Sequence, residues 1–318
     1  MMSVLCVGTL AFDTVETPTD IRERVLGGSA SYFSYAASFF TSVRVVGRVG
    51  YDWPDDFTRR LTERGIDFQG VAKDLSHKSY FWHGRYRNDF QDRETVAIEL
   101  NGFENYKPTV PAAFNDSEFV FLAASAPHVQ LKTISQCPSR KIVFADTVDM
   151  WIETTRPELL KVLSQIDGLF INDIEARQLT GEHQTVRAAK AIRRFGPQWV
   201  VIKKGENGCL AIGPDDLMVS LPGYPTDNLL DPTGAGDSFA GGMIGFLCQS
   251  FRENDFAAGC SNPHRGQINR ALLHRALLHG TAVASFTLSD FSLNALERLE
   301  KTDIERRVAE IQSMLSGT

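Results

Sequence analysis

The chain has 318 residues, of which 43% are hydrophobic and 23% are charged, and its formal net charge is -6. This composition excludes a disordered chain, and the acidic balance argues against a protein that coats nucleic acid, which needs a basic face. No window approaches the ~18 uninterrupted apolar residues of a transmembrane helix. Five scattered cysteines without a CxxC pair are expected to be reduced thiols. We therefore expect a cytoplasmic protein whose partners include neither nucleic acid nor membrane.

Short apolar runs bounded by turn residues alternate along the chain with longer segments of helical spacing. The predicted strands are 4–7, 44–46, 119–122, 141–144, 168–171 and 199–202. The predicted helices are 30–40, 55–64, 157–164, 174–179, 185–195, 235–247, 268–285 and 303–315. Strands that alternate with helices indicate parallel strands joined by crossovers. The expected fold is an α/β, three-layer α/β/α, doubly wound sheet.

Two segments interrupt this alternation. Residues 12–25 are polar and alternating, and 78–100 contains two strand-like runs separated by polar residues 87–93. They are expected to form a small accessory sheet, and ordinary surface hairpins are the alternative. We see no repeat and no long linker, so we expect one domain over 1–318 with lid insertions at approximately 12–26 and 78–104.

The segment that carries chemistry runs from Asp231 to Ile244, with the sequence DPTGAGDSFAGGMI. The small residues Gly234, Ala235 and Gly236 allow a tight turn with exposed backbone amides. An apolar helical pattern follows at once, so the turn is also a helix N-terminus, which attracts anions. A carboxylate in the first helical turn, Asp237, can accept the proton of an attacking hydroxyl or simply cap the helix.

The whole string from Asp231 to Ile244 resembles the C-terminal signature of the ribokinase-like, or PfkB, family of carbohydrate and nucleoside kinases. The resemblance implies a ribokinase-like fold with a β-sheet lid and ATP-dependent phosphoryl transfer. It assigns the catalytic base to Asp237 and an anion hole to the amides of Gly234, Ala235 and Gly236. It also implies that ATP and Mg²⁺ are required.

Further segments resemble family landmarks for the acceptor. Asp13 follows the first strand, where family members place an aspartate that binds substrate hydroxyls, and a turn-forming surface residue is the alternative. Gly27 and Gly28 precede the first long helix, as the family's di-glycine does. The chain departs from the pattern at Tyr32, where the family usually has Asn. This departure puts the sugar contacts in doubt, so no particular substrate is carried over.

Other landmarks concern the nucleotide and cations. Asn172 and Glu175 match the family's NxxE motif and are expected to hold a hydrated Mg²⁺. The strand at 199–202 leads into Lys203, then Gly205 and Gly208, which resemble the segment beside the nucleotide. Either lysine of the 203–204 pair can neutralise phosphate charge, and a solvated pair is nearly as plausible.

Family members also use positions such as Asp231 and Thr233, with a small-residue stretch like 279–286, for a monovalent cation such as K⁺ and near the adenine. The lid of such proteins either closes over a monomer or forms a homodimer interface.

The first candidate function is phosphorylation of a hydroxyl, taken as primary, on a sugar or sugar-like substrate. The alternative is a nucleoside kinase of the same family, favoured by the aromatic and cationic segment 78–86. A catalytically inactive sugar-sensing protein ranks below both. An NAD-dependent dehydrogenase is the least favoured alternative, because no GxGxxG follows the first strand.

Overall fold

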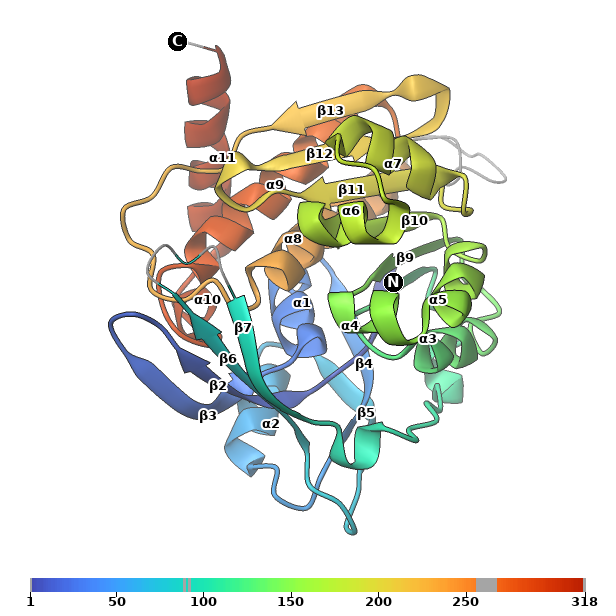
Figure 1. Cartoon of the computed structure of the whole chain (residues 1–318), viewed down its shortest axis with the longest axis vertical. Coiled ribbons are helices and arrows are strands. Elements are labelled where there is room, and N and C mark those ends of the chain that lie inside the picture. Colours follow the sequence, from blue (N-terminus) through green and yellow to red (C-terminus); the bar gives the residue numbers. More distant parts are fainter. Residues whose placement is uncertain (1, 88–89, 91–92, 256–267, 317–318) are drawn as a thin grey trace.

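The protein is built around a nine-stranded sheet (Figure 1). A computed structural model describes residues 2–87, 90, 93–255 and 268–316. Across the sheet the described strands follow the order β13 (Met218–Leu221), β12 (Cys209–Ile212), β11 (Trp199–Lys203), β10 (Gly168–Asn172), β9 (Ile142–Asp146), β8 (Phe119–Leu122), β1 (Ser3–Val7), β4 (Ser42–Val49) and β5 (Asp67–Lys73). The strands from β11 to β5 run parallel to one another. β12 pairs antiparallel with β11, and β13 pairs antiparallel with β12.

Helices cover both faces of this sheet. One core includes α1 (Ser29–Ala37), α2 (Asp55–Thr62), α8 (Ala235–Asp255), α9 (Arg270–Thr287), α10 (Asn294–Glu297) and α11 (Lys301–Ser316). The other core includes α3 (Pro127–Ile134), α4 (Asp149–Thr154), α5 (Arg156–Leu163), α6 (Asp173–Thr180) and α7 (Thr185–Arg193). The expected three-layer, doubly wound architecture is confirmed.

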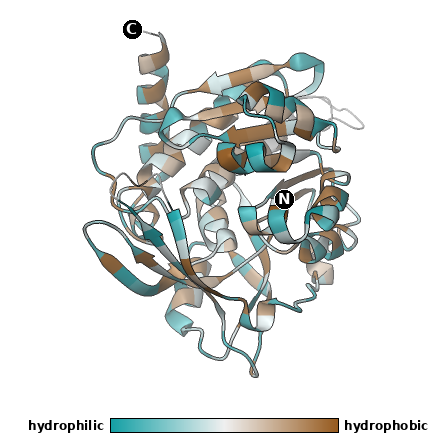
Figure 2. Cartoon of the chain, in the orientation of Figure 1, coloured by the Kyte–Doolittle hydropathy of each residue, from teal (hydrophilic) through white to brown (hydrophobic). Residues whose placement is uncertain are grey.

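Strand alternation explains why two cores form. Along β1, Val4 and Cys6 belong to one core whereas Leu5 and Val7 belong to the other. A strand buried on both faces reads as a continuous apolar run, as the sequence indicates. Figure 2 shows the corresponding brown residues along the central strands and mixed colours on the covering helices.

A separate four-stranded sheet lies beside the main one, at the lower left of Figure 1. Its order is β3 (Ile21–Gly27), β2 (Ala11–Glu16), β6 (Tyr80–Tyr86) and β7 (Arg93–Glu99). Because β2 pairs with β6 in parallel, the two irregular segments form one sheet and not independent surface hairpins. The expected accessory sheet is therefore confirmed.

The sequence did not predict three strands of the main sheet. β5 is an edge strand in which only Gly70 is fully buried, so it lacks the apolar run of a buried strand. β12 and β13 are each four residues long, at the lower limit of strand length. Tertiary pairing, and not local pattern, creates these elements.

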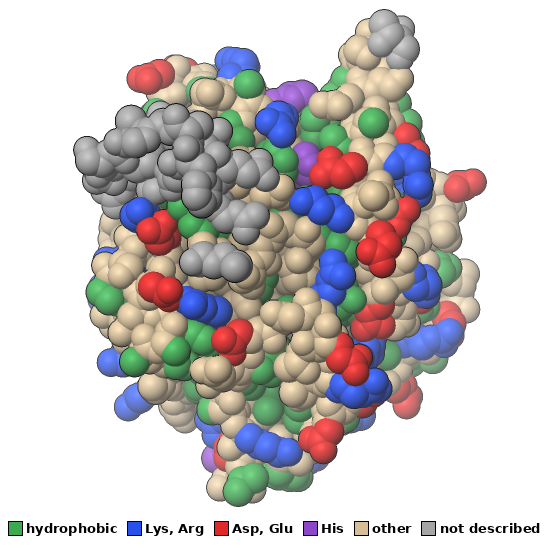
Figure 3. Space-filling view, turned by 180° about the vertical axis from the view of Figure 1, so that it is seen from behind, with side chains coloured by type: hydrophobic (Ala, Val, Ile, Leu, Met, Phe, Trp, Pro, Cys, Tyr) green, Lys and Arg blue, Asp and Glu red, His purple; other side chains and the backbone are tan. Residues whose placement is uncertain are grey.

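Two properties expected from composition can be compared with the described residues. Cys6, Cys137, Cys209 and Cys248 are buried and form no disulfide among the described residues, and Cys260 lies outside those residues. No described helix combines the length and the apolar character that a membrane crossing demands. Figure 3 shows basic and acidic side chains interspersed on the face that it presents.

Candidate active site

The loop that precedes α8 has the geometry of an anion site. Gly234 has φ +74°, and the Tyr32 ring lies 2.3 Å from the position that a Cβ on Gly234 would take, so only glycine fits here. The amide of Ala235 already donates to the Pro232 carbonyl at 3.2 Å. The next amides, of Gly236 and Asp237, belong to the first turn of α8, where helical amides lack an intrahelical acceptor. Residues 234–237 are all partly exposed, so an anion can approach them.

Asp237 stands beside this loop in an environment that disfavours its charge. The pKa of its carboxyl is raised to about 8, mainly by burial and then by the Asp146 carboxylate, against the opposing effect of Lys203. A carboxyl with a pKa near neutrality is suited to exchange a proton with a bound hydroxyl. The residue as a whole is partly exposed, like the loop residues before it.

Asp13 lies on β2 and approaches the di-glycine. The amide of Gly28 donates to Asp13 Oδ2 at 3.4 Å, and a Cβ on Gly27 would stand 2.0 Å from the Asp13 carboxyl carbon. Burial raises the pKa of Asp13 to about 7. The structure therefore brings Asp13, Gly27 and Gly28 together, as the sequence predicted, and both glycines are needed for the close approach.

Tyr32, where the sequence departs from the family pattern, lies inside this arrangement. Its ring packs against Gly234, its side chain is 1% exposed, and its hydroxyl has no hydrogen-bond partner among the described residues. Burial, followed by the carboxylates of Asp231 and Asp13, raises its pKa well above the ordinary value. A neutral phenol thus packs against the loop of residues 232–236 that precedes α8.

Of the two adjacent lysines, the structure directs Lys203 to this region. Its ammonium lies 2.5 Å from Asp146 Oδ2 and 3.2 Å from the position of a Cβ on Gly236. Burial alone would lower the pKa of Lys203, but Asp146, Glu175 and Asp237 raise it above the ordinary value. Sequence reasoning missed Asp146, although a carboxylate that directly follows a buried apolar run is a recognisable signal.

The turn after β11 explains the two glycines of the GxxG segment. Gly205 has φ +54° and Gly208 has φ +77°. A Cβ on Gly208 would come within 2.0 Å of the Leu221 carbonyl oxygen, so β12 and β13 can pair only if this residue is glycine. Their proximity to a nucleotide stays a prediction.

Asn172 and Glu175 form a reciprocal capping box at the start of α6. Asn172 Oδ1 accepts from the Glu175 amide at 2.7 Å, and Glu175 Oε2 accepts from the Asn172 amide at 3.0 Å. Glu175 is 4% exposed, and burial raises its pKa to about 7. With one oxygen of each side chain committed to the cap, direct coordination of a metal is disfavoured. The second Glu175 oxygen can still accept from a metal-bound water, which fits a hydrated Mg²⁺.

Asp231 and Thr233 connect this loop to the small sheet. Asp231 is completely buried, its Oδ1 accepts from the Thr233 amide at 2.8 Å, and its Oδ2 lacks a hydrogen-bond partner among the described residues. Burial raises the pKa of Asp231 to about 6. The Thr233 hydroxyl lies 3.1 Å from the hydroxyl of Tyr86 on β6. Sequence reasoning did not single out Tyr86, because nothing local marks this contact.

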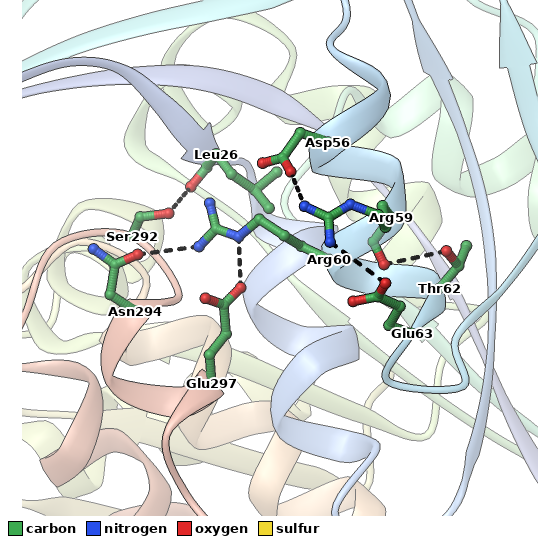
Figure 4. Close-up of polar contacts among 9 residues, drawn as sticks. All are labelled: Leu26, Asp56, Arg59, Arg60, Thr62, Glu63, Ser292, Asn294 and Glu297. Carbon is green, nitrogen blue, oxygen red and sulfur yellow. Dashed lines mark hydrogen bonds and ion pairs between the residues drawn. The ribbon is translucent and has the colours of Figure 1, made fainter.

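Figure 4 shows polar contacts that the C-terminal segment makes with the end of β3 and with α2. The Ser292 hydroxyl donates to the Leu26 carbonyl at 2.5 Å, immediately before Gly27. Arg60 of α2 reaches Glu297 at 2.6 Å and Asn294 at 3.1 Å. These contacts fix the end of β3 relative to the body of the protein.

One face of the small sheet is turned toward these residues. In the strand register Asp13 pairs with Trp82, which pairs with Ile98, so their side chains share a face. Tyr86 lies four positions along the same strand and therefore on the same face, where it contacts Thr233. Trp82 is partly exposed there, and Ile98 is 37% exposed.

Known proteins resemble this chain in sequence. A sequence model described as pfkB family carbohydrate kinase matches residues 2–297. A cytidine kinase of Thermococcus kodakarensis is 26% identical over 249 residues, which cover 77% of this chain and 88% of the relative.

Solved structures show the same fold. The ribokinase of Giardia lamblia superimposes with a TM-score of 0.80 at 15% identity, covering 97% of this chain and 99% of that one. A putative ribokinase II of E. coli, in complex with ATP and Mg²⁺, superimposes with a TM-score of 0.76 at 18% identity, covering 98% and 100%. The expected ribokinase-like fold is therefore confirmed.

Proposed function

Because the chain belongs to the pfkB family of carbohydrate kinases, we propose that it transfers the γ-phosphoryl group of ATP to a primary hydroxyl of a nucleoside. Phosphoryl transfer to an alcohol follows from the family. Two observations favour a nucleoside. Trp82 and Tyr86 share a face of the small sheet with Asp13, and the sequence is similar to that of a cytidine kinase. The sugar acceptor that the sequence analysis ranked first now ranks second.

The proposed reaction uses the residues at the loop as follows. Asp13 accepts hydrogen bonds from the ring hydroxyls of the acceptor, which presents its exocyclic hydroxyl to Asp237. Asp237 takes the hydroxyl proton while the oxygen forms a bond to the γ-phosphorus. The bond from that phosphorus to the β–γ bridging oxygen breaks, and its electron pair leaves with ADP. The amides of Gly236 and Asp237 stabilise the charge on the moving group.

Mg²⁺, when bound with ATP, supplies charge neutralisation of the phosphates. Glu175 is proposed to hold it through water, because only its Oε2 is committed to the cap and its carboxyl lies close enough to Lys203 and Asp146 for both to shift its pKa. The described residues contain no group of three or more His, Cys, Asp or Glu side chains arranged to bind a metal. Glu175 would then contact the ion through its water shell, since Mg²⁺ usually keeps several waters.

The preference for a nucleoside rests on the face that carries Asp13. Trp82 lies in register with Asp13, and its indole covers Gly84, since a Cβ on Gly84 would stand 1.9 Å from the ring. The glycine thus allows the indole to lie along the sheet. A nucleobase attached to a ribose that is held by Asp13 can pack on this ring and on Ile98.

An acceptor panel tests the proposal. ADP release with nucleosides should exceed that with free sugars, and turnover of sugars alone would refute the nucleoside assignment. Since stacking of a base on an aromatic ring is worth ~1–3 kcal/mol, Trp82→Ala should raise the KM for the nucleoside by about ten-fold or more. Trp82→Phe should retain most of the affinity. The matched control is Phe81→Ala, which alters the opposite face of β6 and should leave KM unchanged.

A monovalent cation beside Asp231 is proposed on one observation, the unpaired Oδ2 of a fully buried carboxylate. A cation there would satisfy that oxygen and keep Asp231 ionised. Turnover should rise when K⁺ replaces a large organic cation at constant ionic strength. Asp231→Asn should abolish this response, and a wild-type enzyme indifferent to the cation would contradict the site.

A further inference from the structure

A buried ion pair joins the ends of two strands on either side of β10. Lys203 closes β11 and Asp146 closes β9, and the Lys203 ammonium reaches across to Asp146 Oδ2 at 2.5 Å. The Asp146 side chain is 3% exposed and that of Lys203 is 19% exposed. A buried ion pair seldom adds much stability, because the cost of desolvation offsets the attraction. The Lys203–Asp146 pair is therefore expected to serve a role other than stability.

Asp146 is held in place by groups other than the lysine. Its Oδ1 accepts from the Thr147 amide at 2.9 Å, and its carbonyl accepts from Gln130 Nε2 at 3.0 Å. Gln130 is 1% exposed and also reaches the carbonyls of Leu122 and Ala123. These contacts leave Oδ2 as a fixed point for the ammonium.

The Lys203 ammonium that Asp146 holds lies next to the loop of residues 232–236 that precedes α8. The Lys203 Nζ lies 3.2 Å from the position that a Cβ on Gly236 would take, and Gly236 supplies one of the first-turn amides of α8. An ammonium has three N–H donors, and Asp146 Oδ2 engages one of them. The remaining donors are available to an anion seated on those amides.

We propose that Asp146 is a positioning residue, which holds the Lys203 ammonium beside the Gly236 amide so that it neutralises the phosphoryl group during transfer. This inference rests on the proposed phosphoryl transfer and adds no bond or proton step to it. A lysine side chain has a flexible stem of four carbons, so an unrestrained ammonium would sample many positions. Nearby Glu175 and Asp237 are competing partners, so loss of Asp146 would release Lys203 toward the base itself.

A double-mutant cycle tests the inference. Asp146→Asn and Lys203→Met should each lower kcat by about 100-fold, the scale of one lost electrostatic group, with the acceptor KM changed by less than about three-fold. The double variant should be no slower than Lys203→Met, because Asp146 acts through the lysine. Independent, multiplicative losses would overturn the proposal, as would normal kcat in Asp146→Asn.

Further measurements separate positioning from folding. Asp146→Glu, which keeps the carboxylate, should recover part of kcat. The dissociation constant of ATP, measured by calorimetry, should increase more in Lys203→Met than in Asp146→Asn, and the reverse order would count against the assignment. Thermal unfolding identifies any variant that merely fails to fold.

The chain offers a matched control in Lys141 and Glu118. They form a 2.7 Å ion pair at the amino-terminal ends of β8 and β9, away from the carboxyl ends where Lys203 and Asp146 meet. Lys141→Met should leave kcat unchanged, and a loss equal to that of Lys203→Met would show that the effect is not local. If wild-type protein phosphorylates no nucleoside or sugar, the proposed function fails. If it does and the cycle is additive, only the present inference fails.

Discussion

The hydroxyl of Tyr86 lies 3.1 Å from the hydroxyl of Thr233, and this contact joins the small sheet to the loop of residues 232–236 that precedes α8. Tyr86 belongs to β6 and Thr233 precedes α8. Val15, Tyr86 and Phe291 form a small apolar cluster around it. The small sheet is thus anchored directly at the loop where transfer is proposed to occur.

Tyr86→Phe removes this hydrogen bond and keeps the ring packing. We expect a loss of ~1 kcal/mol in the free energy of unfolding, the usual value for one hydrogen bond. We also expect kcat to fall several-fold, because the sheet is less firmly held over the loop. Urea unfolding and steady-state kinetics measure the two effects. Tyr106→Phe, which loses a 2.9 Å bond to the Gly47 carbonyl, is the control and should lower stability alone.

Asp237→Asn tests the assignment of the base. The amide keeps the shape of the side chain and cannot accept the hydroxyl proton, so kcat should fall by ~10²–10⁴-fold. The dissociation constant of ATP should change little. Asp303→Asn alters another carboxylate in the first turn of a helix and should leave kcat unchanged. Near-normal turnover of Asp237→Asn would reduce Asp237 to a helix cap.

The pH dependence of kcat/KM should report the same group. With its pKa raised to about 8 by burial, Asp237 is mostly protonated at neutral pH. Since the ionised form is the base, kcat/KM should rise with pH and level off above about pH 8. A profile that is flat from pH 6 to 9 would contradict this role.

Stability should respond to pH in the opposite sense. The Asp237 pKa is about 8 in the folded protein against an ordinary 3.8, so the folded state binds this proton more tightly than the unfolded state. The resulting stabilisation is fully present below pH ~4 and is lost as pH rises through ~8. Relative to Asp237→Asn, wild-type protein should therefore lose thermal stability between pH 5 and pH 8. Parallel curves for the two proteins would disprove the shift.

Two glycines with positive φ provide a test of the close approach at the acceptor site. Gly28 has φ +91°, and a Cβ there would stand 2.4 Å from the Thr9 carbonyl oxygen. Gly65 has φ +85° and nothing within 4 Å of such a Cβ. Gly65→Ala should cost ~1–2 kcal/mol of unfolding free energy from backbone strain alone. Gly28→Ala should cost more, because the backbone must also move. Equal losses in urea unfolding would show that the approach is not tight.

The local part of the site was predictable from the sequence. Gly234, Gly236 and Asp237 occupy one turn and the start of one helix, so residue type and spacing suffice to indicate an anion site with a carboxylate. The apolar runs predicted the central strands for the same reason, because burial on both faces leaves a continuous pattern.

Only the tertiary structure decided which distant residues complete the site. Asp146 and Lys203 are 57 positions apart, and Tyr86 and Thr233 are 147 apart, so no local pattern relates them. Strand order places the first pair at the carboxyl ends of β9 and β11, on either side of β10. Strand register places Trp82 beside Asp13. A shift of one residue would have turned that indole to the other face, because side chains alternate along a strand.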